Sequence, residues 1–171
     1  MGSMTAADVL AVLDALVGSG VVASVGGGWG VDALLGRVTR EHADLDVAVD
    51  AAQLGAAEAA LERLGLARAL DERPARVVWG DGRRAVDLHP VHWDAQGTGR
   101  QQGLDGQTFV YPPGSTGSSG LIGGRTVRCC SPDLQLAFHA HYEPRPHDRA
   151  DMAALADAFG LELPPAYRRP G

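Results

Sequence analysis

The chain has 171 residues, of which 45% are hydrophobic, and its formal net charge is −6. This size and composition allow one hydrophobic core, so we predict a single globular domain over residues 4–163. The negative charge disfavours a nucleic-acid partner, because binding phosphates requires a basic surface. All 15 basic residues are arginines, which excludes mechanisms that need a lysine, such as a Schiff base or a Walker A phosphate loop.

The ends of the chain and its apolar runs bear on location. Residues 1–3 are typical of a cloning scar before a natural start at Met4, and we expect residues 164–171 to form an extended tail. No apolar run approaches the ~20 residues that cross a bilayer, and no signal peptide is visible. We therefore expect a cytoplasmic protein with no membrane partner.

In the first half of the chain, helical and strand patterns alternate. Residues 5–18 have apolar side chains at helical spacing, with Thr5 placed to cap the start and Gly18 the end. The pattern then predicts a buried strand over 21–25, a short helix over 29–35, a strand over 44–49 and an amphipathic helix over 51–64 that stops at Gly65.

The second half begins with a hairpin signal, two short strand patterns around Gly80-Asp81-Gly82. The strands expected here cover residues 76–79, 84–89, 108–111 and 125–130, and C-terminal helices are expected within about 131–160, over 132–142 and 147–159. Residues 93–106 and the glycine- and serine-rich residues 114–124 are predicted to be loops. The latter could be taken for a phosphate loop, but they lack its spacing and its lysine, so a connector is favoured.

The two cysteines, Cys129 and Cys130, are adjacent, and neighbouring cysteines do not easily form an unstrained disulfide. We expect reduced thiols on a strand, one facing inward and one outward. The whole order of elements is a mixed one without regular βαβ repetition, so the predicted fold class is α+β (mixed α/β).

The most informative stretch begins with glycines directly after the first predicted strand. Gly26, Gly27 and Gly28 precede the short helix, and glycine permits positive φ and a close approach of the backbone to a ligand. A helix that starts at such a turn presents free N–H groups and a partial positive charge, which suit a phosphate. Alone, this signal is weak.

Two aspartates follow on the next predicted strand, in Asp44-Leu45-Asp46-Val47-Ala48-Val49. Residues two apart on a strand point to the same side, so Asp44 and Asp46 are expected to face away from the core. Two close carboxylates repel each other, and a divalent cation such as Mg²⁺ relieves the repulsion. The alternative is a solvated edge strand with no ligand.

A third acid, Asp87, lies in the second strand of the hairpin, where its neighbours Val86 and Leu88 are expected to face the core. Asp87 and His89 would then share the opposite face. If this strand pairs with the Asp46 strand, the three carboxylates converge. The alternative is that Asp87 is a surface residue near a turn.

These residues carry a family resemblance over about residues 20–160. Gly27-Gly28-Trp29-Gly30-Val31-Asp32, followed by Arg40-Glu41-His42-Ala43-Asp44-Leu45-Asp46 and a later lone Asp87, resembles the small-molecule nucleotidyltransferases of the polymerase-beta superfamily. The likeness is greatest to the aminoglycoside 2''-adenylyltransferases and the lincosamide nucleotidyltransferases. The resemblance implies the nucleotidyltransferase fold, a small mixed sheet flanked by helices, with the three aspartates on one exposed face.

The resemblance also implies a reaction, the Mg²⁺-dependent transfer of a nucleoside monophosphate from a nucleoside triphosphate, with ATP expected, to a hydroxyl of a small molecule. Asp44 and Asp46 would bridge two Mg²⁺ ions, and Asp87 would complete the second site and act as general base. Gly27 and Gly28 would approach the phosphates. The family often has a hydroxyl residue in this turn, and Gly28 and Trp29 stand there instead, so the family's hydroxyl contact to the γ-phosphate is not expected.

Other residues have more open assignments. Arg40 would pair with a phosphate or face solvent, and His42 would orient an acidic ligand or pack beside the strand entry. His89, Tyr142 and Glu143 are expected to border the acceptor. A zinc site at His139, His141 and His147 is disfavoured, because His139 and His141 are two apart on a predicted helix and do not share a face.

The acceptor and the assembly state also stay open. An acidic cleft suits an amine-bearing acceptor such as an aminoglycoside, while an uncharged hydroxyl compound such as a lincosamide or a related natural product remains possible. The chain is short for a two-lobed transferase, so a homodimer would supply the rest of the cleft. An alternative function is a nucleotidyltransferase-like module of the toxin–antitoxin kind that acts on a protein. An inactive relative is disfavoured because all three aspartates are present.

Overall fold

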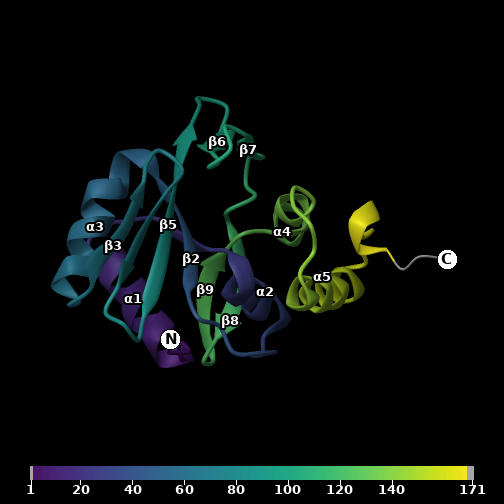
Figure 1. Ribbon diagram of the computed structural model, residues 1–171, viewed down its shortest axis with the longest axis horizontal. Coiled ribbons are helices and arrows are strands. Elements are labelled where there is room, and N and C mark those ends of the chain that lie inside the picture. The colour runs from purple at the N-terminus through teal and green to yellow at the C-terminus, as the bar shows by residue number, and fades with distance from the viewer. Residues whose placement is uncertain (1, 169–171) are drawn as a thin grey trace.

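A mixed β-sheet forms the centre of the molecule (Figure 1). The computed structural model describes residues 2–168. Within this range seven strands pair in the order β3-β4-β5-β2-β1-β9-β8, and β6 and β7 form a hairpin attached to β5. The strands are β1 (Ala23–Val25), β2 (Leu45–Asp50), β3 (Ala67–Glu72), β4 (Arg76–Gly80), β5 (Ala85–Trp93), β6 (Gly99–Gln102), β7 (Thr108–Tyr111), β8 (Ser118–Ile122) and β9 (Arg125–Cys129).

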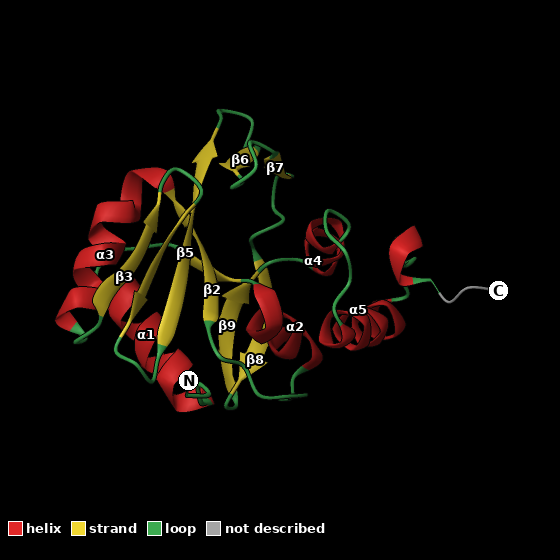
Figure 2. Ribbon diagram, in the orientation of Figure 1, coloured by secondary structure: helices red, strands yellow, loops and turns green. Residues whose placement is uncertain are grey.

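Helices cover the sheet as two groups, which Figure 2 shows in red. The α-helices are α1 (Ala6–Gly18), α2 (Gly27–Leu35), α3 (Leu54–Arg63), α4 (Pro132–His139) and α5 (Pro146–Phe159), with short 3₁₀ turns η1 (Ala51–Gln53) and η2 (Pro165–Tyr167). Helices α1 and α3 pack on each other, while α2, α4 and α5 contact one another near β8 and β9. No helix in residues 2–168 combines the length and apolar character that crossing a membrane requires.

Strand β2 organises the core. Its residues Leu45, Val47 and Val49 are almost fully buried and pack in the main apolar cluster with side chains from α1 and α3. Successive side chains of a strand alternate between faces, so Asp46, Ala48 and Asp50 point to the other side. The strand pairs antiparallel with β1 and parallel with β5, which makes the sheet mixed, as predicted.

Local signals in the sequence account for several element ends. The Thr5 hydroxyl accepts a hydrogen bond from the Asp8 backbone N–H, and the Asp8 carboxylate accepts one from the Thr5 N–H, forming the capping box that starts α1. Ser131 caps α4 through the Leu134 N–H, and Gly160 ends α5 in the left-handed conformation. These caps and the hairpin at residues 80–82 confirm the sequence prediction.

Three strands were not predicted. Strand β3 is an edge strand whose side chains are nearly all exposed, so it has no hydrophobic alternation to detect. Strand β6 lies in the segment 93–106 that was expected to be a loop. It was missed because the residues it buries are Gly99 and Gln101, which give no apolar pattern. Strand β8 lies in the expected connector at 114–124. A Cβ at Gly120 would meet the Ala33 carbonyl carbon of α2 at 2.5 Å, so glycine lets the helix pack directly on the strand.

Other expectations need smaller corrections. Helix α4 ends at His139 instead of Tyr142. Cys130 is buried like Cys129, because it follows β9 into a second apolar cluster below α4. Phe159 is 43% exposed and does not join the buried face of α5. The predicted tail contains η2, whose Tyr167 is buried; residues 169–171 and Met1 lie outside the described residues.

We expect the central strand β5 to be a major source of stability. Leu88 is fully buried in the main cluster, so Leu88→Ala should lower the free energy of unfolding by about 2–5 kcal/mol, measured by urea denaturation. The same substitution at Leu104, which is 64% exposed, should change it by less than about 0.5 kcal/mol. Equal effects of the two substitutions would contradict this account.

Candidate active site

The pairing of β2 with β5 brings two acids together. The strands are parallel and in register, with Asp46 opposite Asp87 and Ala48 opposite His89. The flanking residues Val86 and Leu88 are fully buried, so Asp87 and His89 face the same side as Asp46. Asp46, Asp87 and His89 each offer a ligand atom, and these three atoms lie within 4.8 Å of one another. The sequence predicted this convergence for Asp46 and Asp87.

Asp44 lies just before β2 and not within it. Its side chain is largely exposed and borders the same cleft, but Asp44 is outside the closer group of Asp46, Asp87 and His89. Partial burial of its carboxylate and the negative charge of Asp46 raise the pKa of Asp44. The two aspartates are thus close enough to repel each other, which is the electrostatic situation that a cation relieves.

The Asp46 carboxylate is held by a histidine. His89 Nε2 lies 2.9 Å from Asp46 Oδ1. Burial acts to raise the pKa of Asp46, but the hydrogen bond from His89 and the nearby basic groups, Arg76 among them, together outweigh burial and hold the pKa below its ordinary value. Asp46 is therefore an anion at neutral pH, ready to bind a cation.

Asp87 is nearly buried and has one engaged and one unengaged oxygen. Arg76, on β4, donates from Nη1 to Asp87 Oδ2 at 2.9 Å. Asp87 Oδ1 is buried and has no hydrogen-bond partner among the described residues. Burial raises the pKa of Asp87, and the charge of Asp46 adds to this effect against the opposing charges of His89 and Arg76. An unpartnered buried carboxylate oxygen is costly unless something binds it.

The glycine turn lies directly against these acids. Gly26 caps α2, and its N–H donates to the Asp46 carbonyl at 2.9 Å. Gly27 has φ of +55°, and a Cβ there would collide with Asp46 Oδ2 and lie 2.8 Å from Asp46 Cγ. A Cβ at Gly28 would meet the His42 ring and lie 2.7 Å from Arg40 Nη2. Both glycines are needed because the backbone passes close to charged side chains.

His42 and Arg40 connect the cleft to neighbouring elements. His42 is buried, packs against Trp29, and its Nε2 is 2.5 Å from Asp32 Oδ2. Asp32 also accepts hydrogen bonds from Thr39, and together these contacts fix the segment that carries Arg40. Arg40 pairs with Asp151 of α5 at 2.8 Å while its side chain still lines the cleft.

The C-terminal helices form the opposite wall of the cleft. His139, Tyr142, Arg145 and Asp148 line it, whereas Glu143 is exposed and lies outside the lining. Burial lowers the pKa of His139, whose Nδ1 is 2.7 Å from the Gln135 carbonyl. Among the described residues the three-residue group suited to a metal is the one at Asp46, so the disfavoured zinc hypothesis gains no support.

The whole cleft has a volume of about 600 Å³ and is lined by both acidic and aromatic side chains. Phe109, Tyr111 and Phe138 form the aromatic part, with ring centroids of Phe138 lying 5.5 Å from Phe109 and 4.9 Å from Tyr111. A cleft of this size admits a drug-sized molecule. The carboxylates can bind cations, and the flat rings can pack on the apolar faces of a ligand.

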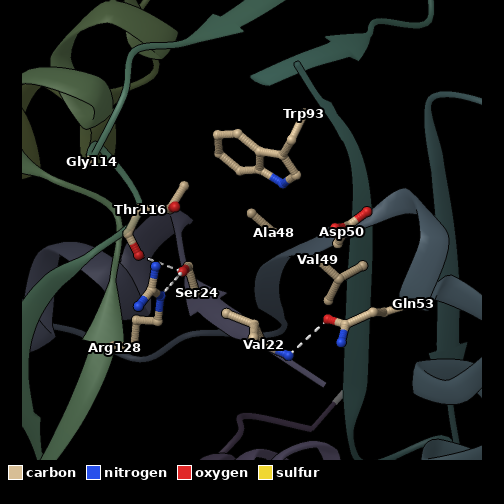
Figure 3. A pocket seen from close by; sticks show the side chains of 10 residues that line it. All are labelled: Val22, Ser24, Ala48, Val49, Asp50, Gln53, Trp93, Gly114, Thr116 and Arg128. Carbon is tan, nitrogen blue, oxygen red and sulfur yellow. Dashed lines mark hydrogen bonds between the residues drawn. The ribbon is translucent and has the colours of Figure 1, made fainter. Parts of the chain in front are cut away.

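A second pocket of about 330 Å³ lies farther along the same face of β2 (Figure 3). Ala48 borders both cavities, and Asp50 and Trp93 line the smaller one. Its Arg128 donates to Ser24 Oγ at 3.1 Å, and Ser24 Oγ donates to the Thr116 carbonyl at 2.6 Å. None of the predicted site residues lines this pocket, so the larger cleft is the candidate site.

Sequence reasoning missed Arg76, Gln101 and Tyr111. Arg76 was predicted only as the first residue of a strand. The predicted hairpin, which pairs residues 76–79 with residues 84–89, could have placed it near Asp87. Gln101 lies in a polar stretch that was expected to be a loop, and Tyr111 was expected only as the end of a short strand. A buried glutamine and a buried tyrosine have no sequence signal of their own.

Comparison with known proteins identifies the family of this chain. The family model of aminoglycoside-2''-adenylyltransferase matches residues 8–155, which include the glycine turn and all three aspartates. The chain belongs to this family. The aminoglycoside-2''-adenylyltransferase family is the one that the sequence resembled, so the chain is a nucleotidyltransferase, as predicted.

Curated relatives of this adenylyltransferase family member include two kinds of resistance protein. A lincosamide resistance protein from Staphylococcus haemolyticus is 28% identical over 154 residues, covering 90% of this chain and 95% of that protein. A 2''-aminoglycoside nucleotidyltransferase from Escherichia coli is 35% identical over 120 residues, covering 69% of this chain and 63% of that protein. The name of the first relative states resistance to lincosamide antibiotics, and the name of the second states nucleotidyl transfer to aminoglycosides.

Solved structures agree with the family assignment. The lincomycin-bound lincosamide antibiotic adenylyltransferase LnuA matches with a TM-score of 0.78 and 28% identity, covering 90% of this chain and 98% of that one. ANT(2'')-Ia in complex with adenylyl-2''-tobramycin matches with a TM-score of 0.74 and 27% identity, covering 91% and 89%. The nucleotidyltransferase fold predicted from the sequence is therefore confirmed.

We expect nucleotidyl transfer to be sensitive to the space beside Gly27. Gly27→Ala would push the new Cβ into the Asp46 carboxylate, and displacing such a group by about 1 Å can lower a rate about 100-fold. The measurement is the transfer rate together with the thermal unfolding midpoint.

Gly65→Ala is the matched control. Gly65 has φ of +87° and open space around its Cβ position, so alanine costs backbone strain of about 1–2 kcal/mol there without touching the cleft. Comparable losses of turnover in the two variants would show that the effect at Gly27 is strain alone.

Proposed function

We propose that this protein transfers a nucleoside monophosphate from a nucleoside triphosphate, preferably ATP, to a hydroxyl of an aminoglycoside or lincosamide antibiotic. The observation that carries the proposal is the in-register pair Asp46 and Asp87 beside the glycine turn of α2. The named activities of the relatives support antibiotics as acceptors. The acidic and aromatic side chains of the cleft are consistent with an amine-bearing or ring-containing ligand.

The donor set fits a divalent cation of the hard kind, and Mg²⁺ is the one we propose, as two ions. Asp46 and Asp87 offer carboxylate oxygens, the ligands that Mg²⁺ prefers, and Asp87 Oδ1 has no hydrogen-bond partner among the described residues. Asp44 borders the same space and would add a third carboxylate. When bound, the cations would make the α-phosphorus more electrophilic and offset charge on the departing pyrophosphate.

Asp87 is our candidate for the general base. The acceptor hydroxyl gives its proton to the Asp87 carboxylate, its oxygen forms the new bond to the α-phosphorus, and the bond to the β-phosphate oxygen breaks to release pyrophosphate. Burial raises the pKa of Asp87, which makes its carboxylate a stronger base than an exposed one. Arg76 keeps the carboxylate in one orientation through its bond to Oδ2.

The triphosphate would lie at the start of α2. Gly27 and Gly28 allow the backbone to approach, and no acidic side chain stands in the first turn of the helix to repel a phosphate. Arg40, held by Asp151 beside Gly28, supplies a positive charge at the same place. His42 acts indirectly, by holding the segment that carries Arg40 through its bond to Asp32.

The acceptor would occupy the rest of the cleft, between β6–β7 and the C-terminal helices. Tyr142, His139 and His89 all line the cleft and are the candidates for contact with the acceptor. Glu143, which is exposed, would contribute only if an acceptor extends beyond the cleft. A homodimer would enclose the acceptor further, and a monodisperse monomer in light scattering would argue against this part of the proposal.

The decisive experiment is a screen of acceptors by mass spectrometry. The protein is incubated with Mg²⁺, one of ATP, GTP, CTP or UTP, and single aminoglycosides or lincosamides, and nucleotide monophosphate adducts are scored. We expect an adduct with at least one antibiotic, most readily from ATP. Absence of any antibiotic adduct, with labelling of a protein partner instead, would favour the toxin–antitoxin alternative.

Asp87→Asn should remove turnover while leaving the fold intact. Asparagine keeps the shape of the side chain but cannot accept the proton, and loss of a general base typically lowers a rate about 10²- to 10⁴-fold. Asp14→Asn is the control, because Asp14 is exposed on α1 and paired with Arg125. Circular dichroism verifies folding, and robust turnover by Asp87→Asn would refute the base assignment.

Removal of divalent cations should also stop transfer. In EDTA we expect turnover to fall to background and to return when Mg²⁺ is added in excess, because without a cation the anionic carboxylates repel the anionic triphosphate. Thermal unfolding gives a second measurement. The excess of acids at the site predicts a higher unfolding midpoint with Mg²⁺ than with the same ionic strength of Na⁺, and equal midpoints would count against metal binding.

A further inference from the structure

We propose that Gln101 and Tyr111 are positioning residues, which fix the Asp46 carboxylate through His89 by a directional chain of hydrogen bonds. The residues come from the β6–β7 hairpin, which sequence analysis did not connect with the site. The inference rests on the proposed role of Asp46 in binding the cation. The inference adds an account of which residues orient the Asp46 carboxylate.

The first link determines which way the Gln101 amide points. Tyr111 Oη donates to Gln101 Oε1 at 2.6 Å, and Gln101 Nε2 donates to the Ala75 carbonyl at 3.1 Å. A carbonyl oxygen only accepts, so the nitrogen of the amide must face Ala75 and the oxygen must face Tyr111. Gln101 and Tyr111 are both buried, and an amide turned the other way would set its oxygen against the Ala75 carbonyl, which cannot donate, and lose that bond.

The second link determines which nitrogen of His89 carries the proton. Gln101 Nε2 also lies 3.0 Å from His89 Nδ1. Because that amide nitrogen is a donor, Nδ1 accepts, and the ring in its neutral form carries its proton on Nε2. His89 Nε2 then donates to Asp46 Oδ1 at 2.9 Å. The order of donation is Tyr111, Gln101, His89, Asp46. Burial acts to lower the pKa of His89, but the hydrogen bond and charge of Asp46 outweigh burial and raise it, so this order of donation applies above that pKa.

The consequence concerns what may ligate the cation. A ring nitrogen that donates its proton to a carboxylate has no lone pair for a metal, so His89 acts behind Asp46 and not as a third ligand. The Asp46 side chain is thereby held from two sides, by His89 at Oδ1 and by the Gly27 backbone near Oδ2. The carboxylate cannot rotate freely before the substrate arrives.

The hairpin is built to bring Gln101 to this place. Strand β6 pairs with the end of β5, and a Cβ at Gly99 would meet Val91 Cγ1 at 2.5 Å and Trp93 Cζ3 at 2.7 Å. Glycine therefore allows β6 to approach β5. The Tyr111 ring packs on Phe138 and Trp93, with centroids 4.9 Å and 6.0 Å away, which aims its hydroxyl at Gln101.

Gln101 also borders the cleft, so the competing explanation is direct contact with the acceptor. The two explanations differ in observables that need no turnover. Positioning predicts an effect on the His89 tautomer and on metal affinity in the protein without acceptor. Direct contact predicts an effect on acceptor KM alone.

The test uses ¹⁵N-labelled full-length protein and long-range ¹H–¹⁵N spectra of the histidine rings, with a His89→Gln spectrum to assign the His89 signals. In the wild-type protein, at a pH above the raised pKa of His89, we expect the Nε2–H tautomer. In Gln101→Met, which keeps the length of the side chain but cannot donate, the Nδ1 signal of His89 should shift and the tautomer preference should be lost. Mn²⁺ affinity, measured by electron paramagnetic resonance without nucleotide, should fall about 10- to 100-fold.

Gln102→Met is the matched control, because Gln102 is the next residue of β6, is exposed, and does not line the cleft. It should leave the tautomer, the Mn²⁺ affinity and turnover unchanged. Tyr111→Phe removes a single hydroxyl and frees the amide to turn, so a smaller change in the same direction is expected. This variant also serves if Gln101→Met does not fold.

An Nδ1–H tautomer in the wild-type protein would overturn the inference. So would an unchanged His89 ring and unchanged Mn²⁺ affinity in a folded Gln101→Met variant, with only acceptor KM raised. These outcomes are separate from the proposed function. If the wild-type protein transfers nucleotide to an antibiotic but the His89 tautomer is the same in Gln101→Met as in the wild type, the positioning role alone is refuted. If the wild-type protein has the expected tautomer but transfers to no antibiotic, only the choice of acceptor is refuted.

Discussion

The site depends on one strand pairing, that of β2 with β5 in parallel and in register. Each strand buries its alternate residues in the main core, and this burial fixes which side chains face the cleft. A slip of one residue in either strand would turn its aspartate into the apolar core. The same hydrophobic contacts that stabilise the fold therefore also determine where the two carboxylates meet.

The two carboxylates are held in different ways, and the difference suits different tasks. Asp46 receives a hydrogen bond from His89 and stays ionised, whereas Asp87 is more deeply buried and has its proton affinity raised. Arg76 limits the cost of burying Asp87 by engaging one oxygen and leaves the other oxygen available. An acid that binds a cation and an acid that accepts a proton can thus lie side by side on adjacent strands.

Much of this arrangement could be predicted from the sequence because it depends on local periodicity. The alternation of polar and apolar residues in β2 and β5 predicted that Asp46 and Asp87 face away from the core, and the glycines after β1 indicated the turn. Gln101 and β6 could not be predicted, because a buried glutamine in a polar stretch has no hydrophobic period. Strand β3 was missed for a related reason, since an exposed edge strand needs no apolar face. The role of Asp151 as partner of Arg40 depends on residues 111 positions apart, and no local pattern encodes that contact.

The exposed edge strand has a consequence for self-association. Strand β3 ends the sheet with free backbone groups on its outer side, where a second sheet edge would ordinarily be able to add. Its side chains include Arg68, Asp71 and Glu72, and Arg68 and Asp71 pair with each other across the surface. A neighbouring molecule would have to strip water from these charges to extend the sheet. This border therefore resists open-ended β-aggregation, and any stable contact between copies is directed to other parts of the surface.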